Sequence, residues 1–472
     1  MNTIEMKSSG YVALALILLL SLACGDDEDD SDPEENVTTN NDTTNNDTQN
    51  NDAAPSFDGE FTVATALELH QSAPDSLTVA GDKMYFFAQT EDLIVEQIFQ
   101  TDGTADGTEL ATEEFLYSSQ GQSWPYALTA FKGSLVFIAD THTNRDEDLA
   151  IIDPDAEDGY RVIVENMGTG TAQTRTSTLT NTDDDLYFTN HTPANGRELY
   201  RSDGTADDVE LIKVINEEGD ADPEDLTAVG DLVFFTALDG DGRDLWVTDG
   251  SEEGTVKVLE SSSLNNPTAF GDLLIFYRGD SVWVSDGTAE GTEELLSESN
   301  VLTRFAVYDD ETVFFGAGDH LWISDGTPGG TEQVTDRISS VGDSTRLGDD
   351  LYFQVGSTIW ISDGTAEGTE RVADVRTGSA SSTGGNPSYL TPYNGRIYFT
   401  ASSDAINSDE QLWVTDGTDE GTHMITPQDE VNEDALSDSG FEEFRMQVFD
   451  GALYFPANYD DNGWQLWRLE TN

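Results

Sequence analysis

The sequence predicts an all-β fold: a single β-propeller of four-stranded antiparallel blades, about nine in number, closed by pairing of the N- and C-terminal strands. One phrase, Leu-Trp-Val-Thr-Asp-Gly-Ser at residues 245–251, recurs in related forms at intervals of roughly 40 to 50 residues, which marks an array of similar units. Short apolar segments bounded by Gly and Asp turns surround each copy, as in antiparallel strands. Repeated four-stranded sheets favour a propeller because radial packing protects their edges.

The most complete unit contains all four expected strands. A short strand at 226–229 leads through a Gly-Asp turn into a second strand at 232–237. A third strand at 244–248 is followed by the Asp-Gly-Ser turn and a fourth strand at 256–259. The second-strand pattern of apolar and aromatic residues occurs nine times. The other eight copies are at residues 85–87, 136–138, 186–188, 274–276, 313–315, 351–353, 397–399 and 453–455.

The two ends of the chain predict how the ring closes. The ninth copy stops after its third strand, at residues 466–469, and lacks a fourth. Residues 61–67, ahead of the first copy, form a strand pattern that has no partner nearby in the sequence. We therefore expect the segment near Val63 to pair with the segment near Trp467, which would remove the two open edges of a linear stack.

The Asp-Gly-Thr turn after most third strands is expected to be structural. The Asp carboxylate would accept hydrogen bonds from backbone amides ahead of it, the Gly would supply a positive φ, and the Thr hydroxyl would cap the turn. A residue present in nearly every blade lies on a ring, whereas catalysis needs one unique constellation. The turn residues are Asp102, Gly103, Asp203, Gly204, Asp249, Gly250, Asp286, Gly287, Asp325, Gly326, Asp363, Gly364, Asp416 and Gly417, while Asp153-Pro154-Asp155 departs from the pattern.

Calcium is the alternative use of these carboxylates, because Ca²⁺ takes about six to eight oxygen ligands. Residues 239–244 begin like a calcium loop, but Arg243 stands where a third ligand is needed. Asp153 and Asp155 alternate suitably with Glu157, yet the glycine of that turn comes one residue late. We expect no metal or other cofactor, with calcium left open.

Aromatic and titratable residues form no catalytic pattern. Six Trp share the third-strand position and are expected to pack between blades, whereas Trp124 and Trp464 lie outside that position and are better, though weak, candidates for a binding surface. No nucleophile, metalloprotease or phosphate-binding motif occurs, so we expect no enzyme activity. A carboxylate pair of the glycoside hydrolase kind is the alternative, although no pair stands out. The six are Trp246, Trp283, Trp322, Trp360, Trp413 and Trp467, and the scattered His are His70, His142, His191, His320 and His423.

The N-terminus predicts export on a lipid anchor. Residues 1–23 contain an apolar run shorter than the about 20 residues that span a bilayer, which suits a signal peptide. The run ends in Leu-Ser-Leu-Ala-Cys, which resembles the lipobox of bacterial lipoproteins, where the Cys becomes the lipidated first residue; here it is Cys24, and Gly25 after it favours the outer membrane. Residues 24–58 are acidic and rich in Asn and Thr, so we expect a disordered tether before a propeller at 59–472.

The charge excludes two classes of partner. The chain has 94 acidic and 20 basic residues, a net charge of −74. Such a field repels nucleic acid and anionic lipid, so we expect contact with a membrane through the lipid anchor only. Because the acids are scattered through the repeats, a solvated acidic exterior is expected, suited to a saline medium or to cation binding. We expect a monomer. With one Cys, no intramolecular disulfide can form.

The repeated Leu-Trp-x-Ser/Thr-Asp-Gly-Thr-x-x-Gly-Thr resembles the ELWxxDGT repeat, also called hyalin-like, of secreted and surface proteins of myxobacteria and related bacteria. The resemblance covers roughly residues 59–472. It fails at residues 151–155, and its acidic first position is often replaced, as by Ser281. It implies an exported propeller and brings no established activity.

These observations predict a lipid-anchored propeller, at the outer membrane or surface of a bacterium, that binds or adheres to an envelope or extracellular protein or glycan without catalysis. A secreted hydrolase of the glycoside type, with a carboxylate site at one mouth of the ring, is one alternative. A structural component of the envelope is the other.

Overall fold

The computed structural model describes most of the repeat region. All described residues belong to one compact unit, Pro55–Asn472. The expected signal segment, Cys24, the tether and Trp124 lie outside the described residues. The described residues are 59–64, 74–89, 97–112, 126–141, 147–167, 179–260, 264–298, 304–336, 341–375, 385–402, 410–425, 436, 446–459 and 464–471.

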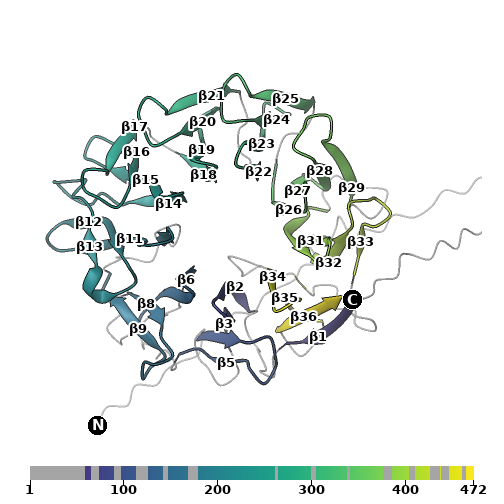
Figure 1. The fold of residues 1–472 in the computed structure, drawn as a ribbon, viewed down its shortest axis with the longest axis horizontal. Coiled ribbons are helices and arrows are strands. Elements are labelled where there is room, and N and C mark those ends of the chain that lie inside the picture. Colours follow the sequence, from purple (N-terminus) through teal and green to yellow (C-terminus); the bar gives the residue numbers. More distant parts are fainter. Residues whose placement is uncertain are drawn as a thin grey trace, which may run out of the picture. The chain divides into compact units, whose positions relative to one another are not determined.

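Nine four-stranded antiparallel sheets stand in a ring, so the predicted nine-bladed β-propeller is confirmed (Figure 1). Eight blades are contiguous in sequence and the ninth combines both ends of the repeat region. Blade 1 is β2 (Asp75–Ala80), β3 (Lys83–Ala88), β4 (Gln97–Thr101) and β5 (Glu109–Leu110). Blade 2 is β6 (Tyr126–Phe131), β7 (Ser134–Ala139), β8 (Asp148–Ile152) and β9 (Tyr160–Val164). Blade 3 is β10 (Leu179–Asn181), β11 (Leu186–Thr192), β12 (Gly196–Ser202) and β13 (Glu210–Leu211).

The remaining blades repeat this order from the centre of the ring outward (Figure 1). Blade 4 is β14 (Glu224–Val229), β15 (Leu232–Leu238), β16 (Arg243–Thr248) and β17 (Val256–Leu259); blade 5 is β18 (Asn265–Phe270), β19 (Leu273–Arg278), β20 (Ser281–Ser285) and β21 (Glu293–Ser297). Blade 6 is β22 (Ala306–Asp309), β23 (Thr312–Ala317), β24 (His320–Ser324) and β25 (Glu332–Asp336); blade 7 is β26 (Ser344–Leu347), β27 (Asp350–Val355), β28 (Thr358–Ser362) and β29 (Glu370–Asp374). Blade 8 is β30 (Ser388–Tyr393), β31 (Arg396–Ser402), β32 (Glu410–Thr415) and β33 (His423–Met424); blade 9 is β34 (Gln447–Phe449), β35 (Ala452–Ala457), β36 (Gln465–Thr471) and β1 (Gly59–Val63).

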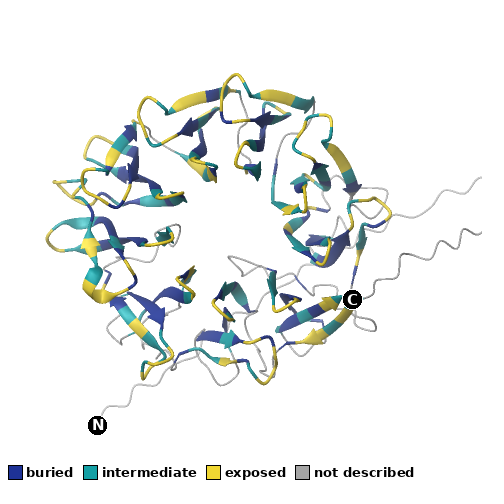
Figure 2. Ribbon diagram, viewed as in Figure 1, coloured by how far each residue is buried: buried dark blue, intermediate teal, exposed yellow. Residues whose placement is uncertain are grey.

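The core consists of the apolar layers between neighbouring blades. Successive side chains of a strand point to opposite faces of its sheet, so each blade fills the layer on either side. In β16, Leu245 packs with Leu274 of blade 5, whereas Trp246 packs with Tyr187 and Leu199 of blade 3. Figure 2 shows the second and third strands buried and the turns and outer strands more exposed.

All six third-strand Trp side chains lie in these layers, which confirms the expected packing between blades. Trp246, Trp413 and Trp467 are buried core members. The other three are partly buried against the same kind of cluster: Trp283, Trp322 and Trp360.

Blade 9 closes the ring with the predicted pairing. Its outer strand β1 runs antiparallel to β36, with Val63 opposite Trp467 and Gly59 opposite Thr471. Phe61 packs edge-on against Phe455, with ring centroids 6.4 Å apart. The strand was predicted at residues 61–67 and begins at Gly59 instead, because β1 must span the length of β36 to pair with it.

Helix is confined to one short 3-10 turn, η1 (Ala206–Asp208), among the described residues. The described part of the chain contains no helix of the length and apolarity that crossing a bilayer requires.

Candidate functional site

The antiparallel order gives the ring two different faces. The turns from first to second strand and from third to fourth strand lie at one end of each blade, and we call this end the turn face. The loops from second to third strand and the crossovers to the next blade lie at the other end, which we call the crossover face. The sequence-predicted Asp and Gly residues all lie on the turn face.

The turn of blade 4 shows what each polar residue of the repeat does. Asp249 Oδ1 accepts hydrogen bonds from Ser251 N (2.9 Å) and Ser251 Oγ (2.6 Å). Ser251 Oγ in turn accepts a bond from Gly254 N (2.9 Å), and Ser251 O accepts one from Thr255 Oγ1 (2.6 Å). Thr255 Oγ1 lies 2.7 Å from Thr248 Oγ1. The polar groups of the motif therefore bond chiefly to one another.

Both glycines of this turn are required by close contacts. Gly250 has φ +86°, and a Cβ there would lie 2.8 Å from Tyr187 Oη of the preceding blade. A Cβ on Gly254 would lie 2.0 Å from Asp249 Oδ1, because the carboxylate folds across it. The first glycine thus permits contact between blades and the second makes room for the Asp side chain.

The same hydrogen bonds recur in five further blades, and blade 1 carries the contact across the ring closure. Tyr454 Oη of blade 9 donates to Gly103 O at 3.1 Å. Burial raises the pKa of the Tyr454 phenol, so it stays a neutral donor. The turns with the full set are at Asp102 and Gly103, Asp286 and Gly287, Asp325 and Gly326, Asp363 and Gly364, and Asp416 and Gly417.

Blades 2 and 3 keep part of this turn. In blade 3, Asp203 Oδ1 accepts from Thr205 N (2.9 Å) and Thr205 Oγ1 (2.6 Å), but Asp208 replaces the second glycine and its Oδ2 accepts from Asp203 N (3.3 Å). In blade 2, Asp153 Oδ1 still accepts from Asp155 N (3.1 Å). Residues 153–155 were expected to depart from the turn pattern, and they do so only in part, because the bond from the backbone amide to the Asp carboxylate is kept.

Four of the turn carboxylates are exposed and have a lowered pKa. A hydrogen bond from the Thr or Ser hydroxyl two residues on is the main cause that lowers the pKa of these carboxyl groups, and a backbone amide lowers it further. Charged forms that are stabilised in this way have little tendency to take up a proton for general acid catalysis. The lowered groups are Asp102, Asp203, Asp249 and Asp363.

The two calcium candidates hold cationic side chains. Lys257 Nζ lies 2.8 Å from Asp239 Oδ2 and 3.0 Å from Asp244 Oδ2, so an ammonium occupies the loop at 239–244. Arg161 Nε lies 3.2 Å from Asp153 Oδ2. Within the described ranges, no group of three or more His, Cys, Asp or Glu residues could hold a metal ion.

The structure keeps the predicted His residues apart. His191, His320 and His423 belong to blades 3, 6 and 8. His191 Nε2 lies 3.9 Å from Asp220 Oδ1 on the crossover face. His70 and His142 fall outside the described residues.

Buried acids on the crossover face were missed by the sequence analysis. The position before the third-strand Leu carries Asp148, Glu198 and Asp244 in blades 2 to 4, all nearly or fully inaccessible to solvent. Asp148 Oδ1 accepts from Asn166 N (2.8 Å), and Glu198 holds two amides of the next crossover. The sequence signal that could have indicated them is the first position of the repeat, where blades 2 to 4 carry an acidic residue. Asp148 and Glu198 thus fix the path of the chain as it leaves their blades.

The sequence analysis also missed a second repeated structural feature. In five blades the innermost strand has a β-bulge at a non-glycine residue with positive φ. The backbone carbonyl of that residue accepts a hydrogen bond from the hydroxyl of the Thr two positions later. In blade 4, Thr227 Oγ1 donates to Asp225 O at 3.1 Å. The pattern Pro-x-x-Leu-Thr at residues 74–78, 125–129, 223–227 and 387–391 marks four of the five. The bulged residues are Ser76, Ala127, Asp225, Asn266 and Tyr389.

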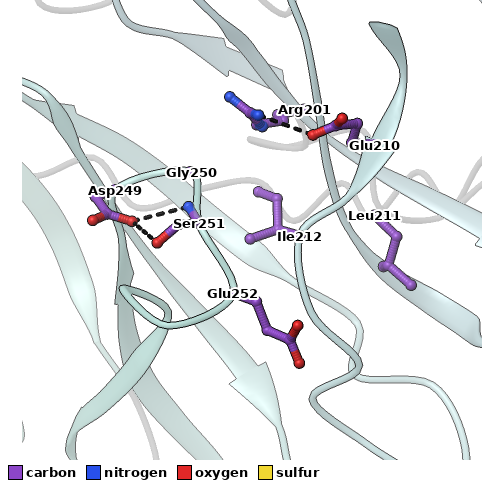
Figure 3. Close-up of a pocket in the computed structure, with 8 residues that line it drawn as sticks. All are labelled: Arg201, Glu210, Leu211, Ile212, Asp249, Gly250, Ser251 and Glu252. Carbon is purple, nitrogen blue, oxygen red and sulfur yellow. Dashed lines mark hydrogen bonds and ion pairs between the residues drawn. The ribbon is translucent and has the colours of Figure 1, made fainter.

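A small open pocket lies between blades 3 and 4 on the turn face (Figure 3). It has a volume of about 320 Å³ and is lined by residues 201 and 210–212 of blade 3 and by the turn 249–252 of blade 4. Arg201 is paired with Glu210 (2.9 Å) and with Asp185 (3.1 Å), and these bonds raise the pKa of its guanidinium. The guanidinium in the pocket wall is therefore already paired with two acids of blade 3.

No family model and no curated protein matches this chain. Among solved structures, the chain is similar to a prolyl endopeptidase (12% identity, TM-score 0.43), with 84% of this chain and 55% of that chain covered. It is also similar to a puromycin hydrolase (15%, TM-score 0.35; 84% and 62% covered) and to the β-propeller domain of the Trilobed protease from Pyrococcus furiosus (12%, TM-score 0.34; 66% and 99% covered). The chain thus spans about three-fifths of the length of the first two proteins or less. No activity of these proteins is carried over to this chain.

Proposed function

We propose that this protein is a non-catalytic binding module, a rigid ring that binds an envelope or extracellular protein or glycan through its crossover face. The observation that carries the proposal is the contrast between the faces. The turn face repeats the same residues, and their hydrogen bonds and contacts hold the hairpin and the neighbouring blade. The polar groups of these residues therefore hold the fold together.

The crossover face offers the unrepeated residues that specific recognition needs. Its loops differ from blade to blade: residues 192–196 are Thr-Pro-Ala-Asn-Gly, residues 238–243 are Leu-Asp-Gly-Asp-Gly-Arg, and residues 317–320 are Ala-Gly-Asp-His. The crossover of residues 212–223 adds four acids. With a net charge of −74, we propose a neutral or cationic partner for this face.

We propose further that Cys24 carries a lipid and that the chain is a member of the ELWxxDGT repeat family. The support is the apolar run before Cys24, the acidic segment after it, and the repeat itself. Cell fractionation tests the anchor: wild-type protein should sediment with membranes, and Cys24→Ser should be found in the soluble fraction. Membrane association that persists in Cys24→Ser would contradict the anchor.

The binding proposal is tested with a glycan array and with immobilised protein exposed to envelope extract, each across a range of salt and calcium concentrations. One variant shortens the loop 239–242 to Gly-Asp, as found in the hairpin of blade 6, and its control is Ser251→Thr on the turn face. We expect the loop variant to lose the ligand and the control to keep it. Absence of any ligand, or loss in the control alone, would contradict the proposal, and hydrolysis of an arrayed glycan would contradict its non-catalytic part.

A further inference from the structure

The crossover from blade 3 to blade 4, residues 212–223, is held to blade 3 at both ends. At its near end, Glu198 Oε2 accepts from Ile215 N (3.1 Å) and Glu198 Oε1 from Asn216 N (3.2 Å). At its far end, Asp220 Oδ1 accepts from Arg197 N (2.8 Å), and Arg197 Nη1 lies 2.9 Å from Asp222 Oδ1. Acidic side chains therefore fix both ends, one buried and one exposed.

The near end depends on an isolated buried charge. Glu198 is fully inaccessible to solvent, and its partners in the described part of the chain are two neutral amides. Burial raises the pKa of Glu198 to about 7; the two amide bonds act against the rise and the charge of Asp220 adds to it. A carboxylate in this setting exchanges its proton near neutral pH.

Charged side chains of blades 3 and 4 contact the far end of the crossover. On blade 3, His191 of β11 and Arg197 of β12 both contact Asp220. From blade 4, Arg243 Nη1 donates to Asp222 O (2.8 Å). These contacts concentrate on the far end and leave Glu198 without a countercharge among the described residues.

A segment that follows blade 2 connects that blade to blade 3. Asp148 holds Asn166 N, and Glu147 O accepts from Met167 N (2.7 Å). Met167 O then accepts from His191 N (2.9 Å). Blade 2 is thus joined to blade 3 beside Asn190 through backbone hydrogen bonds, and the charge that raises the pKa of Glu198 is that of Asp220.

An acceptor for the proton of neutral Glu198 lies on the adjacent strand. Asn190 of β11 stands directly opposite Glu198 of β12 in the sheet register. Its side chain is 6% exposed, and its Oδ1 is buried with no hydrogen-bond partner in the described structure. Opposed residues on antiparallel strands place their side chains on the same face, about 5 Å apart at Cβ. A protonated Glu198 can therefore donate to Asn190 Oδ1.

We propose that this crossover is a pH-operated latch. In the ionised state, the two oxygens of Glu198 hold the amides of Ile215 and Asn216. When Glu198 takes a proton from solvent water, its new O–H donates to Asn190 Oδ1, and one amide loses its acceptor. Residues 215–219 are then released from blade 3, while the bonds of Asp220 and Asp222 keep the far end in place. The crossover face thereby changes shape on acidification while the turn face does not.

Amide hydrogen exchange of the full chain, read by mass spectrometry on peptides covering 212–223, tests this latch. After correction for the intrinsic pH dependence of exchange, we expect wild-type exchange in this segment to rise about tenfold as pH falls from 8 to 6, the effect of losing one hydrogen bond. Glu198→Gln, which mimics the neutral acid, should exchange fast at both pH values. Glu218→Gln on the same crossover is the matched control and should behave as wild type.

Asn190→Ala provides an independent variant. Without the acceptor, neutral Glu198 is less stable, so the midpoint of the exchange change should move to lower pH. Protection that is independent of pH in the wild type would overturn the latch, and so would a wild-type pH response in Glu198→Gln. Near-UV circular dichroism confirms that each variant is folded, and ligand binding is not needed for any of these readings.

Discussion

The two faces of this ring use the same contact, a carboxylate that accepts backbone N–H groups, in opposite surroundings. On the turn face, Asp249 is exposed and a Ser hydroxyl adds a bond that lowers the pKa of its carboxyl group. On the crossover face, Glu198 accepts two amides but is fully buried, and burial raises the pKa of its carboxyl group to about 7. Burial rather than the number of hydrogen bonds therefore decides the sign of the shift. The turn face therefore carries a carboxylate that stays ionised at neutral pH, whereas the crossover face carries one whose pKa lies near neutral pH.

On the turn face, the largest loss of stability is expected from a side chain that fills the space under a turn carboxylate. A Cβ on Gly330 would lie 2.0 Å from Asp325 Oδ1, whereas a Cβ on Gly329 meets nothing within 4 Å. We expect Gly330→Ala to lower the free energy of unfolding by about 4 kcal/mol, through overpacking and lost turn hydrogen bonds. Gly329→Ala should change it by less than about 0.5 kcal/mol. Urea unfolding measures both, and equal effects of the two substitutions would show that the turn is not built as described.

The buried acid should give the crossover face the larger pH dependence. Because the pKa of Glu198 is raised from 4.5 to about 7, folded protein keeps a proton that unfolded protein has released between these pH values. Its stabilising contribution is full below pH 4.5 and is lost as pH rises through about 7. We expect Glu198→Gln to remove this dependence, so that the change in its free energy of unfolding between pH 4.5 and 8 differs from that of wild type by about 3 kcal/mol. Urea unfolding across this pH range, with Glu218→Gln as control, measures it; a variant that parallels wild type would contradict the assignment.

Blade 4 offers a sharper comparison, because its buried acid has a countercharge. Lys257 lies 3.0 Å from Asp244 and 2.8 Å from Asp239, and these hydrogen bonds raise the pKa of the Lys257 ammonium. We expect Lys257→Met to cost about 2 kcal/mol at neutral pH, through loss of hydrogen bonds to charged groups. The loss should shrink in acid, because the hydrogen bond from Lys257 lowers the pKa of Asp239 and this stabilisation is lost as Asp239 takes up a proton. A loss that is constant with pH would show that the pair matters through packing alone.

The smallest effect is expected from acidification of the turn face. The depressed pKa of Asp249 contributes stability that is present above its unfolded value of 3.8 and is lost as pH falls through the lower folded value. Ser251→Ala removes the hydroxyl bond, so its destabilisation should be visible at neutral pH and should fade as pH falls below 3.8. Added salt should weaken it, because the group is exposed. Thermal unfolding measures the effect, and Glu252→Gln removes a charge from the same turn without touching these bonds.

Much of the propeller fold could be predicted because the residues of the repeat motif form their hydrogen bonds with one another, within a single turn. The Asp-Gly-Ser turn of blade 4 indicated two strands joined by a hairpin, and β17 has the bounds expected for the fourth strand, Val256–Leu259. The missing fourth strand after Trp467 indicated the closing partner, and Val63 lies opposite it. Local chemistry and strand count were enough for both conclusions.

The crossover face could not be predicted in the same way. The burial of Glu198 and its place opposite Asn190 depend on packing between strands that the sequence does not show. The bulge at Asp225 left a pattern, Pro-x-x-Leu-Thr, but one composed of common strand and turn residues. Asp208 in place of the second glycine of blade 3 gave no local sign that η1 would form there.

The distinction between two faces requires a closed ring, and a designed disulfide tests closure most directly. In a Cys24→Ser background, Glu60→Cys with Glu470→Cys joins residues that are opposite in the register of β1 and β36, while Thr62→Cys with Glu470→Cys is shifted by two residues. The measurement is the fraction of protein cross-linked under mild oxidation, together with the unfolding midpoint with and without reductant. We expect nearly complete cross-linking and a higher midpoint for the opposed pair, and little cross-linking for the shifted pair. Failure of the opposed pair to cross-link in folded protein would contradict the ring.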